Sequence, residues 1–352
     1  MSNLEWLSQA PQAIDQAAMT AAGEHQQILT KPAGSLGQLE TLAIRFAGMQ
    51  GQVKPQIEKI QVTTFAADHG LAAQGVSAFP QAVTAQMVSN FAHGGAAVSV
   101  LAKARGADFE VVNLGTVGPV EDHPAVVQAV IASSTADCSQ APAMTGEQLA
   151  QALNTGRERV LAAAEKGTQL FIGGEMGIGN TSAASMIAAA LTDSTLEELV
   201  GPGTGLDNAG VRAKQAILED VMALHAARLD TPLGVLQSVG GFEIAALCGA
   251  YLACAQQGIA ALVDGFISSA AALLACRIQP DVKDWLVFSH NSAEPGHRAM
   301  LQALQVQPLL SLGMRLGEGS GAVLAVDLLR SACLLHGNMA TFADAGVADK
   351  SA

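Results

Sequence analysis

One unit repeats along the chain between residues 59 and 290, and it constrains the fold more than any other feature. Each copy is a short run of apolar and β-branched residues that ends in glycine or polar residues and leads into an alanine-rich stretch. Apolar strands that alternate with helices are typical of a parallel sheet covered on both faces. The pattern therefore predicts an α/β fold with a parallel sheet flanked by helices. The five runs are KIQVTTFAADHG (59–70), FEVVNLG (109–115), TQLFIGGEMG (168–177), IAALVDG (259–265) and DWLVFSHNS (284–292).

The polar residues of all five runs fall where the predicted strands end. In such sheets, ligands bind beyond the carboxyl ends of the strands, and parallel strands bring these ends to one edge. We therefore expect the runs to share one binding site.

Composition excludes several classes of function. Half of the 352 residues are hydrophobic and only 14% are charged, so the chain can bury a large core. The net charge of -13 argues against nucleic-acid binding, because phosphate recognition on that scale needs clustered Lys and Arg. A small anionic ligand is compatible with this charge if glycine loops and helix ends supply the positive potential.

Both ends of the chain predict helices that pack beside the sheet. In residues 31–49, apolar residues follow helical spacing, and Ser35 and Gln38 have the spacing of a capping box. Residues 322–346 indicate a buried helix followed by a shorter one.

The sequence carries no signal of secretion or of a membrane span. The N-terminus lacks a basic region followed by an apolar one, so we expect no signal peptide. The most hydrophobic stretch, residues 244–276, is interrupted by polar residues, which predicts helix, strand and helix instead. The cysteines form no C-x-x-C pair and predict buried thiols in a reducing cytoplasm. They are Cys138, Cys248, Cys254, Cys276 and Cys333.

The motif RLGEGSG (315–321) places Glu318 between glycines, just before an apolar helical run. Glycine flanks let the backbone turn sharply and approach a ligand, and the free N–H groups of the next helix face the same spot. Glu318 is therefore a candidate general base. The alternative is a carboxylate that only favours the positive end of the helix dipole.

Two glycine loops enter helices in the middle of the chain. In GGEMGIGNTSAASMIAAAL (173–191), backbone N–H groups near Asn180 and Thr181 could hold a phosphate, or the glycines could serve packing alone. The loop matches neither a Walker motif nor the dinucleotide fingerprint. In GPGTGLDNAGVRAKQAIL (201–218), Lys214 could reach a phosphate, although an isolated helical lysine is usually solvated.

Two pairs of polar residues follow predicted strands. Asp68 and His69 could bind a metal, orient a ligand or cap the next turn, and no second His or Cys at ligand spacing supports the metal. His290 and Ser292 could contact a ligand or form local hydrogen bonds. Because no nucleophile motif is present, the set suits transfer of a phosphorylated group with one general base.

Eight ordered segments resemble the nicotinate-nucleotide:dimethylbenzimidazole phosphoribosyltransferases, from about residue 31 to the C-terminal helices. The resemblance implies a pentosyltransferase that moves the 5-phosphoribosyl group from nicotinate mononucleotide to 5,6-dimethylbenzimidazole or a related aromatic base. The products would be nicotinate and the α-ribazole 5′-phosphate used for the lower ligand of cobalamin. The segments are KPAGSLGQLE, ADHG, GGEMGIGNT, GPGTGLD, VGGFEIAAL, LVDGFISSAAALLA, SHNSAE and RLGEGSGA.

The resemblance also implies an architecture. We expect a Rossmann-like large domain over residues 55–295 and a small helical domain formed from residues 1–54 and 296–352, within a single catalytic unit. It further implies a cytoplasmic homodimer that needs no cofactor and no metal.

Residue roles follow from the same resemblance. Glu318 would take the N–H proton of the benzimidazole, Glu175 and Ser292 would lie near the ribose, and Leu316 and Gly317 would contact the substrates. The residues around the phosphate would be Gly177, Asn180, Thr181, Gly203, Thr204 and Lys214.

The acceptor site departs from the pattern of many relatives, which have smaller or more polar residues there. Phe79, Met87 and Met176 would reshape the base site if they line it, and ordinary core packing is the alternative.

Two other functions are weighed against transfer. A non-catalytic nucleotide-binding protein is disfavoured because Glu318 keeps its full glycine context. A glycohydrolase is disfavoured because water needs no apolar acceptor pocket.

Overall fold

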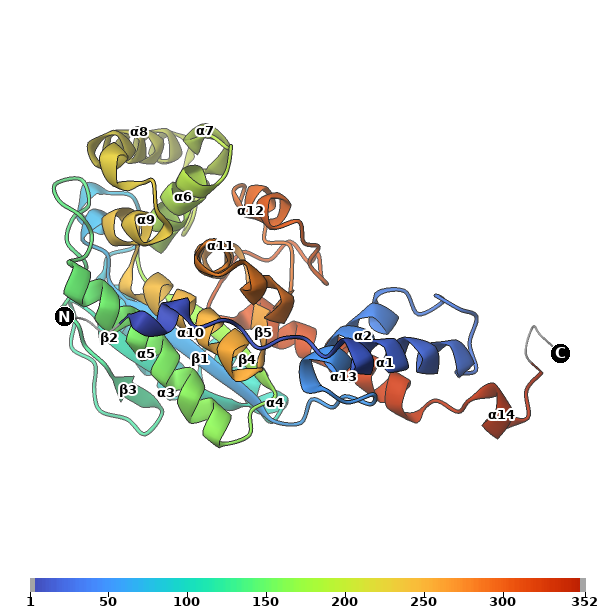
Figure 1. The fold of residues 1–352 in the computed structure, drawn as a ribbon. Helices are drawn as coiled ribbons and strands as arrows, with labels where there is room; N and C mark the ends of the chain where they lie inside the picture. Colours follow the sequence, from blue (N-terminus) through green and yellow to red (C-terminus); the bar gives the residue numbers. More distant parts are fainter. Residues whose placement is uncertain (1–3, 349–352) are drawn as a thin grey trace.

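The computed structural model describes residues 4–348 and is built on a six-stranded parallel sheet with the strand order β3-β2-β1-β4-β5-β6 (Figure 1). All five predicted strands are confirmed. The additional edge strand β3 was not predicted, because its three residues, VVQ, are too few to form a recognisable apolar run. The strands are β1 (Ile60–Ala67), β2 (Asp108–Gly115), β3 (Val126–Gln128), β4 (Leu170–Met176), β5 (Ala260–Val263) and β6 (Leu286–Phe288).

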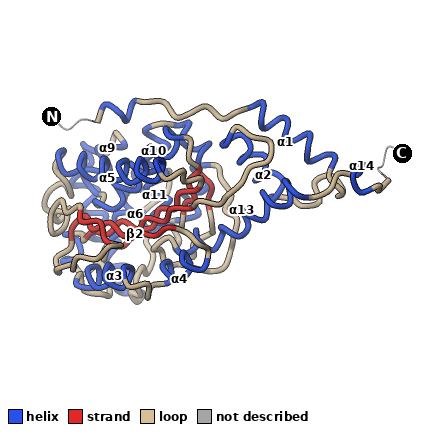
Figure 2. Tube along the Cα trace, turned by 90° about the horizontal axis from the view of Figure 1, so that it is seen from below, coloured by secondary structure: helices blue, strands red, loops and turns tan. Residues whose placement is uncertain are grey.

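Helices cover both faces of the sheet, as the sequence predicts for an α/β fold. Helices α3 (Ala82–Ala92) and α4 (Ala97–Ala104) lie on one face (Figure 2). Helices α5 (Gly146–Glu165), α10 (Phe242–Gln257) and α11 (Phe266–Ile278) lie on the other face. The order α10, β5, α11 confirms helix, strand and helix for the most hydrophobic stretch. Buried apolar residues of all three layers form one continuous core.

Glycine sets the distance between α5 and α10. A Cβ atom at Gly249 of α10 would overlap the carbonyl oxygen of Leu153, and one at Gly156 of α5 would overlap that of Ala246. The two backbones therefore touch directly. Helix α10 is almost completely buried between α5, α11 and the sheet.

The remaining helices complete the predicted strand, loop and helix units. Both glycine loops lead into helices, α6 after β4 and α8 after the second loop, so these two predictions are confirmed. The other helices are α1 (Gln16–Ile28), α2 (Gln38–Gln50), α6 (Asn180–Leu191), α7 (Leu196–Leu199), α8 (Asn208–His225), α9 (Pro232–Val239), α12 (His297–Leu304), α13 (Ser320–Asn338) and α14 (Phe342–Ala345).

Helices from the two ends of the chain lie together, away from the sheet (Figure 1). Gln26 Nε2 of α1 lies 2.7 Å from His336 Nδ1 of α13. The segment before α1 runs back over the sheet, where Trp6 Nε1 donates to Asn154 Oδ1 of α5 at 2.7 Å. Helix α12 packs beside α11. The domain boundaries at residues 55 and 295 stay a prediction.

The predicted capping box at Ser35 is wrong. Helix α2 begins at Gln38, which makes Gln38 its first residue, and the N-cap is Gly37 in a left-handed conformation with no side-chain cap. Glu40, in the first turn of α2, instead accepts a hydrogen bond from Leu36 N, outside the helix, at 3.0 Å. Lys31 Nζ lies 2.9 Å from the same carboxylate oxygen. The spacing of Ser35 and Gln38 suggested an N-cap at Ser35, but the turn that precedes the helix delays its start to Gln38.

Helix α13 has 19 residues and is long and apolar enough, by length and composition, to cross a membrane. However, 56% of its most apolar window is buried inside the fold, as in the core helix of a folded domain.

The predicted unpaired thiols are confirmed: all five cysteines are free, four of them buried and Cys276 partly buried. Burial raises the pKa of the Cys138 thiol to about 12, which makes it unreactive.

Substitution of Gly249 by alanine should loosen the contact between α5 and α10. Because the new Cβ would overlap the carbonyl oxygen of Leu153, the helices must move apart, and we expect Gly249→Ala to lower the free energy of unfolding by about 1–3 kcal/mol. Urea denaturation would measure it. The matched control is Gly23→Ala in α1, where a Cβ meets nothing within 4 Å and a gain of about 0.5–1 kcal/mol is expected. Equal effects of the two substitutions would contradict this account.

Candidate active site

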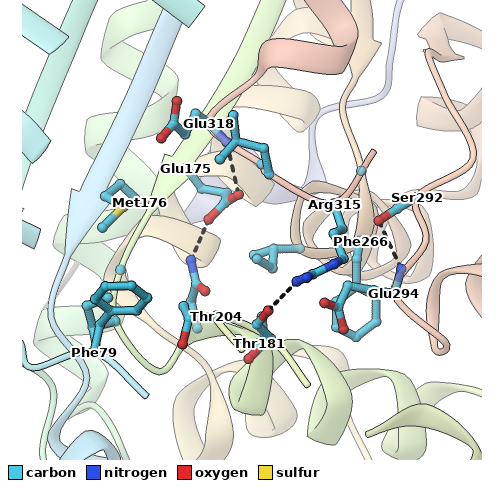
Figure 3. A pocket seen from close by; sticks show the side chains of 18 of the residues that line it. Phe79, Glu175, Met176, Thr181, Thr204, Phe266, Ser292, Glu294, Arg315 and Glu318 are labelled. Carbon is cyan, nitrogen blue, oxygen red and sulfur yellow. Dashed lines mark hydrogen bonds between the residues drawn. The ribbon is translucent and has the colours of Figure 1, made fainter. Parts of the chain in front are cut away.

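A cavity of about 290 Å³ lies at the carboxyl ends of the strands, where the sequence predicts the shared site (Figure 3). It brings together twelve of the fourteen predicted site residues. These are Phe79, Glu175, Met176, Gly177, Asn180, Thr181, Gly203, Thr204, Ser292, Leu316, Gly317 and Glu318. The other two are Lys214, which lies directly behind the wall, and Met87, which is not among the lining residues.

The backbone around Glu318 is held in an unusual conformation. Glu318 has a φ of 68° and follows Gly317 with a φ of 84°, so a non-glycine residue occupies the left-handed region. Such a conformation costs about 1–3 kcal/mol and persists only where neighbours fix it. Thr64 Oγ1 of β1 donates to the Glu318 carbonyl at 3.1 Å. A Cβ atom at Gly174 of β4 would overlap this carbonyl, so only glycine allows the loop to rest on the sheet.

The Glu318 carboxyl group is buried and reaches the cavity. Its side-chain atom Oε2 has no hydrogen-bond partner among the described residues, and the residue is 7% exposed. Burial, and then the nearby charge of Asp264, raise its pKa to about 7. A carboxyl group with a pKa near neutrality can both accept and release a proton under physiological conditions.

Glu175 stands at the end of β4 and joins two walls of the cavity. Asn180 Nδ2 donates to its Oε2, and Glu318 N lies 3.4 Å from its Oε1 (Figure 3). A Cβ atom at Gly317 would meet Glu175 Oε1, and the φ of 84° at Gly317 favours glycine there as well. Burial, followed by the charges of Asp264 and Glu243, raises the pKa of Glu175 well above its usual value.

One end of the cavity is suited to an anion. Lys214 Nζ, from α8, donates to Thr181 Oγ1 at 2.8 Å, and Thr181 lies in the first turn of α6. Arg315 donates to the carbonyl oxygen of Gly203 at 2.8 Å. Burial lowers the pKa of Lys214 to about 8, against the opposing effect of Glu294. Two cationic side chains therefore meet a helix N-terminus, an arrangement that favours phosphate.

Sequence reasoning missed Glu294 and Arg315 as individual site residues. Glu294 is 6% exposed, and burial raises its pKa although Lys214 and Arg315 lower it. Both residues stand in motifs that carried the family resemblance, SHNSAE and RLGEGSG, so position in those motifs was the available signal. The other unpredicted lining residues are Ile178, Gly265, Phe266 and Ile267, whereas His290 was considered and does line the cavity.

The opposite side of the cavity is apolar. Phe79 and Met176 lie together on that side, across from Arg315 and Ser292 (Figure 3). Phe79 is 52% exposed and Leu316 is 56% exposed, so both flank the open mouth. The structure places Met87 differently from the prediction: it is partly buried in α3 and packs against the core. This position agrees with ordinary core packing, the alternative for this residue, and its contact with the acceptor stays a prediction.

Asp68 and His69 lie beneath the first glycine loop and are engaged in hydrogen bonds. Asp68 accepts from Thr84 Oγ1 at 2.6 Å and from Val117 N at 2.9 Å, which agrees with a structural cap. His69 Nε2 lies 2.6 Å from Glu243 Oε1. Within residues 4–348, no group of three or more His, Cys, Asp and Glu side chains could hold a metal ion.

Comparison with known proteins agrees with this geometry. A family model described as Phosphoribosyltransferase matches residues 11–347. The chain is 59% identical over 348 residues to the nicotinate-nucleotide–dimethylbenzimidazole phosphoribosyltransferase of Pseudomonas putida (strain W619), covering 99% of both chains. It is 57% identical to that of Pseudomonas fluorescens (strain SBW25) over the whole of both chains. The crystal structure of the Thermus thermophilus enzyme is similar with a TM-score of 0.90 and 43% identity, over 96% of this chain and 100% of that one.

The raised pKa of Glu318 should reduce stability at alkaline pH. The folded protein binds the proton of the Glu318 carboxyl group more tightly than the unfolded chain does. The stabilisation that comes from this protonation is therefore lost as the pH rises from about 4.5 to about 7. Glu318→Gln removes the ionisation, and we expect it to stabilise the protein by about 1–3 kcal/mol at pH 8 and by much less at pH 5. Chemical denaturation of both proteins at the two pH values would measure the difference. Equal effects at both values would contradict the expected burial of the charge.

Proposed function

The chain belongs to the nicotinate-nucleotide–dimethylbenzimidazole phosphoribosyltransferase family, and on that premise we propose that Glu318 is the general base of its transfer reaction. The enzyme moves the 5-phosphoribosyl group from nicotinate mononucleotide to 5,6-dimethylbenzimidazole. Nicotinate leaves, and α-ribazole 5′-phosphate enters the nucleotide loop of cobalamin. A related aromatic base could also serve as acceptor.

One observation carries the proposal. Glu318 lines the cavity together with the residues of its apolar side and of its anion-binding end, and its Oε2 has no hydrogen-bond partner among the described residues. An aromatic base resting against Phe79 and Met176 would bring its N–H group towards this carboxylate. The ribose would then lie near Glu175 and Ser292, and the phosphate near the start of α6. One carboxyl group thus faces the point where acceptor and sugar must meet.

The chemistry needs no covalent intermediate. The pyridinium nitrogen of nicotinate mononucleotide leaves as a neutral ring nitrogen, so the bond to C1′ weakens as positive charge develops on the ribose. The imine nitrogen of the benzimidazole attacks C1′, and its other nitrogen becomes acidic as the new bond forms. Glu318 accepts that proton. While it is ionised, the Glu318 carboxylate also favours the positive charge on the sugar.

The phosphate anchors the donor substrate. Lys214 and Arg315 supply positive charge, while Gly177, Gly203 and Thr204 let the backbone approach the anion closely. These contacts involve a part of the substrate that does not react. Their binding energy can therefore position C1′ against the incoming base.

The acceptor side supports a preference for a flat apolar base. Phe79 and Leu316 are both about half exposed at the mouth of the cavity and would be covered by an aromatic ring.

We also infer that the protein is a homodimer in the cytoplasm. The exposed side chain of Leu312 supports the dimer, and the unpaired cysteines support the cytoplasm. Light scattering of the purified protein tests the dimer.

Nicotinate release tests the reaction and its base. We expect release from nicotinate mononucleotide to depend on added dimethylbenzimidazole, and we expect Glu318→Gln to slow turnover by about 10²–10⁴-fold while binding of the nucleotide is kept. Rapid-quench or steady-state assays would measure turnover, and calorimetry would measure binding. Release without acceptor would indicate hydrolysis, binding without release would indicate a non-catalytic protein, and near-normal turnover of the variant would remove Glu318 from the mechanism.

Lys214 should control donor affinity and the alkaline side of the pH profile. Its ammonium form is present below a pKa of about 8, so kcat/KM for nicotinate mononucleotide should fall as the pH rises through that value. We expect Lys214→Met to raise KM for the donor about 10–100-fold, which corresponds to the loss of a hydrogen bond to a charged group. The alkaline decline near pH 8 should then disappear. Lys103→Met, at an exposed position of α4, is the control and should leave both quantities unchanged.

A further inference from the structure

Asp264 follows β5 directly and is bound to the segment that carries Glu318. It is 1% exposed, and both of its carboxylate oxygens accept backbone hydrogen bonds. Gly319 N donates to Oδ2 at 3.1 Å, and Ala322 N donates to Oδ1 at 2.9 Å. These amides belong to the N-terminus of α13, whose own N-cap, Gly319, has no side chain. A carboxylate from another strand therefore caps the helix in its place.

This cap acts on the residue next to the base. The Glu318 carbonyl is held by Thr64 Oγ1, and the following amide, Gly319 N, is held by Asp264. The peptide unit between them is thus fixed from both sides. Because Glu318 has a left-handed backbone, loss of either contact would let the loop relax and move the carboxyl group.

Asp264 also sets the charge around the base. The titratable groups that interact with it come from five other parts of the fold: Glu175 from β4, Tyr251 from α10, His290 after β6, His297 from α12 and Glu318 from the loop before α13. His290 Nε2 lies 3.5 Å from Asp264 Oδ1, and its two ring nitrogens have no hydrogen-bond partner among the described residues. Beyond Glu175, Glu243 of α10 adds another buried carboxyl group.

We propose that Asp264 is a positioning residue for the transfer reaction: its carboxylate accepts the Gly319 and Ala322 amides and so holds the backbone of Glu318 in place, and it keeps a negative charge beside the base. The proposal rests on the proposed role of Glu318 as base. Both effects have one source, because one carboxylate caps α13 and also raises the pKa of Glu318. Burial is the largest cause of this raised pKa, and the charge of Asp264 is the next.

The variant Asp264→Asn tests whether Asp264 acts on the base, through its hold on the Glu318 backbone and through its charge, or only stabilises the fold. An asparagine oxygen accepts one of the two amides, and the charge is lost. We expect kcat to fall at least about 10-fold with KM for nicotinate mononucleotide changed less than about threefold, because the misplaced base affects the transition state. The acid limb of kcat/KM, near pH 7 in the wild type, should move to lower pH, since Glu318 loses a negative neighbour. An unmoved limb, or a loss through KM alone, would overturn the proposal.

Asp68→Asn is the matched control. Asp68 is also a fully buried carboxylate after a strand, and it also accepts two hydrogen bonds, but none from α13. We expect this variant to lower the melting temperature as Asp264→Asn does, without moving the acid limb. An equal shift in both variants would show a general effect of destabilisation and would also overturn the proposal.

Amide hydrogen exchange tests the cap without reference to activity. In the wild-type protein, the Gly319 and Ala322 amides should be as protected as amides inside α13, although first-turn amides usually exchange fast. At least one of them should exchange more than about 10-fold faster in Asp264→Asn. Unprotected amides in the wild type would overturn the proposal even if the variant does not fold. If the wild type shows no acceptor-dependent nicotinate release, the proposed function fails, while this measurement still decides the cap.

Discussion

The contact between the Glu318 carbonyl and the glycine of β4 underlies the whole site. At Gly174 no side chain separates the strand from the loop before α13, so the loop rests directly on the sheet. Thr64 donates to the same carbonyl. This contact joins the C-terminal helix to the centre of the sheet and places a carboxyl group at its edge. Without it, the cavity would have no wall on the side of the base.

The site concentrates charges of the same sign in a dry environment. Glu175, Glu243, Asp264 and Glu318 are all nearly or fully buried within a few strands of one another. Burial and the neighbouring charges raise the pKa of Glu175 and of Glu318, which opposes folding at higher pH. Hydrogen bonds from Asn180, from the amides of α13 and from His69 offset part of this cost. The large core offsets the rest of the unfavourable free energy of these buried carboxyl groups. Their environment in turn gives a base that works near neutral pH.

Polarity divides the cavity in a way that matches a substrate pair with different needs. Lys214, Arg315 and the N-terminus of α6 suit a phosphate, whereas Phe79, Met176 and Leu316 suit a flat aromatic ring. Glu318 lines the same cavity as both regions. Each region comes from separate strand ends, so the parallel sheet is what allows distant segments of the chain to serve one reaction.

Local patterns in the chain predicted five of the six strands, both glycine loops and the candidate base, because apolar periodicity and glycine content act over a few residues. They gave no information on which strands are neighbours or which side chains meet. Packing brought Asp264 beside Glu318, buried Lys214 against Thr181 and left Met87 outside the lining of the cavity. Helix α2 begins after Gly37, without the cap expected from Ser35. The first three of these outcomes depend on packing between segments far apart in the chain. Burial and distance are properties of that packing, and they alone raise the pKa of Glu318 to a value suited to its proposed role.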